Sequence, residues 1–148
     1  MASPIDRKFA LLVFVALLAA CSGKSNAPPD NVVTTLQSVQ LKPGTGAVVA
    51  NGQIAVVQYT GWLYEASAAD HKGKQFDSSR TAGREPFKFP LGTGSVINGW
   101  DQGVVGMKIG ESRRLVIPAE LAYGDAGFSG AIPPGATLVF DVELVGIE

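Results

Sequence analysis

The sequence predicts an α+β fold in which one antiparallel sheet curls over one short helix. Its 148 residues include 18 glycines and 9 prolines, which favour turns and short strands over long helices. The clearest strand covers residues 137–145, where apolar and polar side chains alternate so that one face is apolar. The one helix candidate is short, from Asn98 to Met107, and Gly110 follows it as a stop signal.

Residues 1–20 are expected to be a signal peptide. Arg7 and Lys8 precede an apolar run over residues 9–20, which is too short to cross a bilayer of about 30 Å. The run ends in Leu-Ala-Ala-Cys, which resembles a bacterial lipobox, and Cys21 is the only cysteine of the chain. We therefore expect a lipoprotein attached to a membrane through lipid on Cys21. The alternative is an ordinary secretory signal that is cleaved near a cysteine by coincidence.

Residue 22 is a serine rather than an aspartate, which in lipoproteins of this kind favours the outer membrane. The expected location is therefore the bacterial cell envelope, on the outer membrane facing the periplasm. Residues 21–35 are polar, contain a Pro-Pro pair and lack an apolar period, so they are expected to form a flexible tether behind the lipidated cysteine. The folded domain then covers residues 36–148.

Within that domain the elements follow from short apolar patterns. A first strand lies over residues 36–41 and ends at Pro43-Gly44. The run from Ile54 to Tyr64 places Ala55, Val57 and Tyr59 on one face, and residues 112–117 form a further strand rich in apolar side chains. No stretch of the sequence repeats.

Composition excludes several function classes. The chain carries 12 basic and 13 acidic residues, so no charge excess points to nucleic acid. One cysteine and one histidine, His71, make a metal site improbable, and no cofactor is implied. Gly92 and Gly94 lack the lysine and the βαβ context of a phosphate-binding loop, and no serine lies in a Gly-x-Ser-x-Gly elbow.

A series of short motifs carries the functional signal. In chain order they are Tyr59-Thr60-Gly61, Phe76-Asp77-Ser78-Ser79-Arg80, Pro86-Phe87-Lys88-Phe89, Val96-Ile97-Asn98-Gly99-Trp100, Tyr123-Gly124, Ile132-Pro133-Pro134 and residues 138–144. Together these closely resemble the FKBP-type peptidyl-prolyl cis/trans isomerases, from about Leu36 to the C-terminus. The lipobox suggests the bacterial lipoprotein form. Taken singly, each aromatic residue of the set could instead be an ordinary core residue.

The resemblance implies a site and its ligands. It implies that proline-containing polypeptides, and also macrolide inhibitors, bind an apolar pocket. The substrate-binding residues would be Tyr59, Phe76, Phe87, Val96, Trp100, Ile132 and Phe140. Three further residues would act on the reacting bond: Ile97 through its backbone N–H, Tyr123 through its hydroxyl and Asp77 through its carboxylate. A carboxylate between Phe76 and Ser78 is physically reasonable only where it has polar partners.

The chemistry expected of this pocket is the rotation of Xaa-Pro bonds in exported proteins, without covalent chemistry. These bonds exchange between cis and trans over tens to hundreds of seconds, because rotation loses amide resonance of about 18–20 kcal/mol. A dry aromatic slot favours the twisted, less polar amide over the planar one. The alternative is a related domain that binds partners or unfolded chains without catalysis.

Two parts of the sequence depart from the common pattern of the family. In the loop over residues 124–134, Phe128 stands where a histidine is frequent, and Ala131 stands where an isoleucine is frequent. These differences are expected to affect the range of ligands more than activity. The polar loop over residues 65–74 is longer than the tight turn of many members, and the sequence does not reveal what it contacts.

Overall fold

The computed structural model describes residues 32–148, and the predicted signal peptide, Cys21 and most of the predicted tether lie outside the described residues. This part of the chain contains the strands β1 (Gln37–Lys42), β2 (Ile54–Tyr64), β3 (Lys72–Ser78), β4 (Phe87–Pro90), β5 (Ser112–Ile117) and β6 (Leu138–Ile147). The helix α1 covers Asn98–Val104, and 3-10 turns lie at Ala69–His71 (η1), Ala119–Leu121 (η2) and Gly124–Ala126 (η3). None of the helices between residues 32 and 148 is long and apolar enough to cross a membrane.

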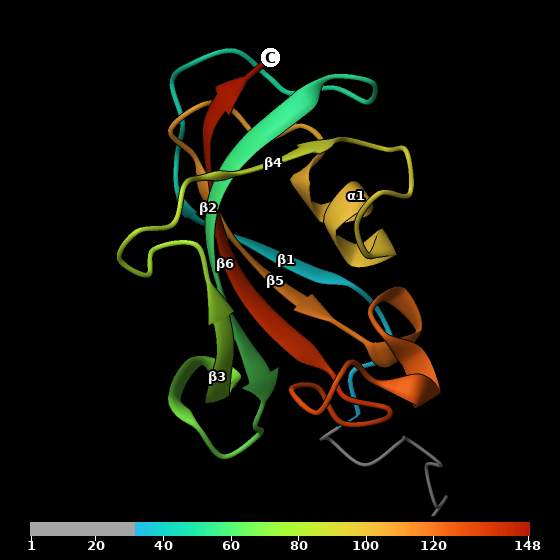
Figure 1. Cartoon of the computed structure of the whole chain (residues 1–148). Coiled ribbons are helices and arrows are strands. Elements are labelled where there is room, and N and C mark those ends of the chain that lie inside the picture. Colours follow the sequence, from blue (N-terminus) through green and yellow to red (C-terminus); the bar gives the residue numbers. More distant parts are fainter. Residues whose placement is uncertain (1–31) are drawn as a thin grey trace, which may run out of the picture.

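The strands form one antiparallel sheet in the order β1-β5-β6-β2-β3, and β4 pairs with β2 beyond the end of β3. Figure 1 shows this curved sheet with α1 lying against one of its faces. The predicted α+β architecture is therefore confirmed. β3 and β4 were not predicted as strands, because β3 is mostly polar and β4 is only four residues long.

The core lies between α1 and the face of the sheet that the strand patterns mark as apolar. The alternation in β6 buries Leu138, Phe140, Val142 and Leu144, each at most 4% exposed. The helix approaches β5 closely at Gly99, where a Cβ would lie 2.4 Å from Ile117 Cγ2. Glycine is required there because a side chain would push α1 off the sheet, and this contact sets the position of Trp100.

The helix ends earlier than predicted, at Val104 instead of Met107. Val105 leaves the helical conformation with ψ of 134°, and Gly106 takes a left-handed φ of 82°. Met107 nevertheless remains completely buried. The apolar pattern thus identified Met107 correctly as a core residue, although the helix ends before this position.

The segment over residues 65–74, predicted as a loop, ends in the first three residues of β3 and is fastened to the face of the sheet opposite α1. Asp70 contacts Arg114 at 3.0 Å, and Lys72 donates to Asp141 at 2.6 Å. The Lys72 ammonium also lies 4.1 Å from the centre of the Trp62 ring. These contacts place the segment on the face of the sheet opposite the one that α1 covers.

Candidate active site

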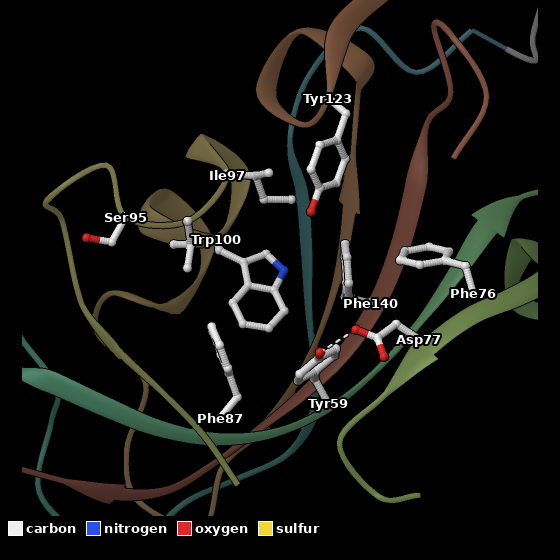
Figure 2. A pocket seen from close by; sticks show the side chains of 10 residues that line it. Tyr59, Phe76, Asp77, Phe87, Ser95, Ile97, Trp100, Tyr123 and Phe140 are labelled. Atoms are coloured by element: carbon white, nitrogen blue, oxygen red, sulfur yellow. Dashed lines mark hydrogen bonds between the residues drawn. The ribbon is translucent and has the colours of Figure 1, made fainter. Parts of the chain in front are cut away.

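An open pocket of about 200 Å³ lies between the sheet and the N-terminal end of α1. Its lining residues are Tyr59, Phe76, Asp77, Phe87, Ser95, Val96, Ile97, Trp100, Tyr123 and Phe140 (Figure 2). The structure therefore brings together nine of the ten predicted site residues, all except Ile132. Ile132 is 4% exposed and packs in the core. Ser95 lines the pocket without having been predicted, since a serine in a turn carries no distinctive signal.

Trp100 is one of the two most buried residues of the pocket: like Phe140, it is 4% exposed. Tyr59 and Phe140 meet its ring in T-shaped contacts, with centroids 5.0 and 5.3 Å away, and Phe87 does so at 6.0 Å. Such edge-to-face contacts match the positive edge of one ring to the negative face of another. Within residues 32–148, the indole Nε1 is the one buried side-chain nitrogen or oxygen without a hydrogen-bond partner. The rings therefore hold the indole in an almost wholly apolar setting.

Asp77 is the one acidic residue that lines the pocket. Its Oδ2 accepts a hydrogen bond from the Tyr59 hydroxyl at 2.5 Å, and its Oδ1 accepts from Arg84 at 2.5 Å and from the Ser78 N–H at 2.9 Å. Burial alone would raise the pKa of Asp77, but the bonds from Tyr59, Arg84 and Ser78 outweigh it, and the pKa lies below its ordinary value. The carboxylate is therefore ionised at neutral pH and fixed in place.

Asp77 in turn changes the pKa of its hydrogen-bond partner Tyr59. Burial, and then the hydrogen bond to Asp77, raise the pKa of Tyr59 to about 12, so its hydroxyl remains a donor.

Arg84 was not predicted as a site residue. A signal for it existed, because a carboxylate in an aromatic segment calls for a nearby cation and Arg84 lies in the exposed loop that follows.

Tyr123 and Ile97 supply donors on the other side of the pocket. Figure 2 shows the Tyr123 hydroxyl pointing into the pocket. Burial raises the pKa of Tyr123, and the charge of Asp77 adds to the effect, so this hydroxyl also stays protonated. Ile97 immediately precedes α1: its carbonyl accepts from the Trp100 N–H at 2.9 Å, whereas its own N–H lies outside the hydrogen bonds of the helix.

The charge state of the acidic residues leads to a prediction for stability. The folded state lowers the pKa of Asp77, Glu111 and Asp141, in each case because hydrogen bonds and cations outweigh burial. Groups of this kind stabilise the fold above their unfolded pKa of about 4 and lose that contribution as the pH falls through the folded pKa. We expect the urea midpoint to fall on acidification from neutral pH to about pH 3. Glu111→Gln should reduce this dependence, and an equal dependence in both proteins would contradict the assignment.

Two kinds of comparison with known proteins agree with this geometry. Residues 46–145 match the family model described as FKBP-type peptidyl-prolyl cis-trans isomerase. The chain belongs to this family. Over 105 residues it is 49% identical to FK506-binding protein 1B of Neurospora crassa, which covers 71% of this chain and 91% of that protein. Over 150 residues it is 42% identical to peptidyl-prolyl cis-trans isomerase FKBP15-2 of Arabidopsis thaliana, covering 100% of this chain and 86% of that protein.

A third relative is peptidyl-prolyl cis-trans isomerase FPR2 of Saccharomyces cerevisiae, 54% identical over 97 residues, which are 66% of this chain and 67% of that protein. These comparisons confirm the predicted activity: the chain is a peptidyl-prolyl cis/trans isomerase. Between residues 32 and 148 no cluster of metal-ligating side chains is found.

The predicted location is wrong. The relatives described above are fungal and plant proteins, whereas an outer membrane facing a periplasm belongs to bacteria. The error has a simple source. Leu-Ala-Ala-Cys is a four-residue pattern of common small and apolar residues, and such a pattern can arise at the end of an apolar run by chance.

Proposed function

We propose that the pocket of Trp100 and Asp77 is where this isomerase rotates Xaa-Pro bonds. The proline ring would lie against the Trp100 indole, and the reacting amide would lie between Asp77 and the donors Tyr123 and Ile97. The observation that carries the proposal is a single ionised carboxylate, fixed by Tyr59 and Arg84, at the wall of an otherwise aromatic pocket. Neither a nucleophile nor a proton transfer is needed for this reaction.

The aromatic walls would lower the barrier by disfavouring the planar amide. The planar form is strongly dipolar because of resonance, and it loses more hydration in a dry pocket than the twisted form does. The Tyr123 hydroxyl and the Ile97 N–H can then donate to substrate carbonyls in the geometry of the twisted state. Interactions made only in that state raise the rate, whereas those made equally in both states only tighten binding.

Asp77 would act as a fixed charge instead of an acid or base. Both of its oxygens already accept hydrogen bonds, and its lowered pKa keeps it deprotonated. Such a charge is attracted to the positive carbon of the substrate carbonyl and resists rearrangement during rotation. Arg84 has the supporting role of holding the carboxylate in that orientation.

The experiment is a pair of substitutions with a matched control. We expect Asp77→Leu and Tyr123→Phe each to lower kcat/KM by a factor that corresponds to about 1–3 kcal/mol, the range of ordinary to charge-assisted hydrogen bonds. Tyr64→Phe removes a hydroxyl from a tyrosine that stacks on His71, outside the pocket, and should leave kcat/KM unchanged. Unchanged rates in both pocket variants would assign catalysis to the aromatic walls alone.

We also propose that macrolides occupy the same pocket, since relatives are named FK506-binding proteins. A large ligand rests on the rim as well as on the pocket, and Ala131 lies exposed on the loop that carries Phe128. Ala131→Ile adds three carbons, worth about 2 kcal/mol if a ligand buries them. We expect it to change macrolide affinity much more than the turnover of a short Xaa-Pro peptide, with calorimetry and an isomerase assay as measurements. Equal shifts in the two would place the rim within the catalytic pocket.

Three predictions about the N-terminal region are kept as proposals. They are a signal peptide over residues 1–20, a tether over residues 21–35 and a domain over residues 36–148, within which the family match at residues 46–145 falls. The predicted lipid on Cys21 belongs to the bacterial location, which the fungal and plant relatives contradict. The mass of the N-terminal peptide of the mature protein would test the signal peptide, since an N-terminus before residue 21 would contradict cleavage there.

A further inference from the structure

One wall of the pocket continues an exposed turn of the chain. Ser95, Val96 and Ile97 line this wall, which lies across the pocket from Asp77 (Figure 2). Residues 92–94, which precede the wall, are exposed, so packing in the core does not hold them in place. The wall can keep a fixed position only if other contacts fasten this turn to the rest of the fold.

The carboxylate of Asp101 fastens the turn to α1. The Gly92 N–H donates to its Oδ1 at 2.8 Å, and the Gly94 N–H donates to its Oδ2 at 2.9 Å. Both glycines take a left-handed φ, of 78° and 74°, which glycine adopts without strain. Thr93 between them donates from its hydroxyl to the Pro90 carbonyl, just before the turn. Among residues 32–148, the two bonds to Asp101 are therefore the hydrogen bonds that join the turn to the helix.

Asp101 is also attached to the other end of the same wall. Its own N–H donates to the Ile97 carbonyl at 3.3 Å, and in α1 it directly follows Trp100. One residue thus holds the start of the wall through its side chain and the end of the wall through its backbone. Asp101 does not line the pocket, so it can act on a substrate only through the residues that it holds.

We propose that Asp101 is a positioning residue of this isomerase, which fixes the Ile97 N–H in front of the reacting bond. This inference rests on the proposed function of the pocket, in which that N–H donates to a substrate carbonyl. A donor stabilises the twisted amide best when it is already aimed at the carbonyl and does not have to reorganise. Without Asp101 the wall is free to shift, and a misplacement of about 1 Å can lower a rate by as much as about a hundredfold.

Two substitutions of Asp101 test this role. Asp101→Ala removes both acceptors, whereas Asp101→Asn keeps the size of the side chain but turns an NH2 donor toward one of the two N–H groups. We expect each variant to lower kcat by about tenfold and to change KM by less than about twofold, because the Ile97 N–H acts in the twisted state. The amide protons of Gly92 and Gly94 should exchange with water about tenfold faster.

Gln102→Ala is the matched control. It truncates the next side chain of α1, which is exposed, and should leave kcat and the exchange of both glycine amides unchanged. All variants are assayed at a temperature at which they are fully folded, so that a loss of stability alone leaves kcat unaffected.

The inference is overturned if the glycine amides of Asp101→Ala exchange faster while kcat stays the same. A rise in KM alone, or full activity in Asp101→Asn, would overturn it as well. Each of these results leaves the proposed function intact as long as Asp77→Leu and Tyr123→Phe lower kcat/KM. If those two variants are as active as the unchanged protein, the proposed function fails and the inference fails with it.

Discussion

We expect Glu111→Ala to lower the free energy of unfolding by about 3 kcal/mol, the cost of breaking a buried ion pair. The Glu111 side chain is 3% exposed and accepts two hydrogen bonds from Arg113, at 2.6 and 3.0 Å, and one from the Lys108 N–H at 3.0 Å. Its removal leaves a largely buried guanidinium and a backbone donor without their acceptor, and each such group costs free energy.

The same ion pair holds the end of α1. Arg113 donates to the Gly103 carbonyl at 2.9 Å, one of the carbonyls that the last turn of a helix leaves without a partner. Loss of Glu111 therefore weakens the attachment of the helix that carries Trp100. Urea denaturation measures the effect. Glu143→Ala is the matched control: Glu143 pairs with Arg80 at the surface, where an ion pair is worth about 0–1 kcal/mol. Equal losses in the two variants would contradict the role of Glu111.

We expect Gly61→Ala to abolish most of the isomerase activity. Gly61 lies in β2, opposite Phe140 in β6 and Asp77 in β3. A Cβ at this position would lie 2.6 Å from Phe140 Cε1 and 2.7 Å from Phe76 Cζ, closer than side chains approach one another. Both rings line the pocket. The added Cβ would therefore force them either into the pocket or away from each other. Overpacking of this kind costs about 1–3 kcal/mol in stability. A similar cost on the barrier lowers kcat/KM by about 5- to 160-fold.

Gly146 in β6 is the matched control for this substitution. A Cβ there would lie 3.6 Å from the nearest atom, Cβ of Val56, which is ordinary contact, and the backbone is not in the left-handed region. Gly146→Ala should leave both kcat/KM and the urea midpoint close to those of the unchanged protein. Full activity in Gly61→Ala would show that the Phe76 and Phe140 rings do not shape the reaction.

The positions of strands could be predicted from the sequence where one face of the strand is buried. β2, β5 and β6 lie close to their predicted positions because the side-chain period of two is imposed by a core on one side. β3 offered no such pattern: Lys72, Lys74 and Gln75 are polar, and its pairing with β2 shifts register between Gly61 and Tyr64. The position of such a strand is set by its pairing with the neighbouring strand, here β2, and not by a pattern of its own side chains.

The sequence by itself determined the fold class, because the strands alternate apolar and polar residues over a buried core. It determined the family and nearly all of the pocket through the resemblance of its short motifs to the FKBP-type isomerases. Only the tertiary structure decided the state of Asp77. Its carboxylate is held by Tyr59, which is 18 residues away, and by Arg84, on an exposed loop. The requirement for glycine at position 61 is likewise invisible in sequence, because it depends on two rings from β3 and β6 that meet above β2. Contacts made in the folded chain set both features, and the period of the strands does not encode them.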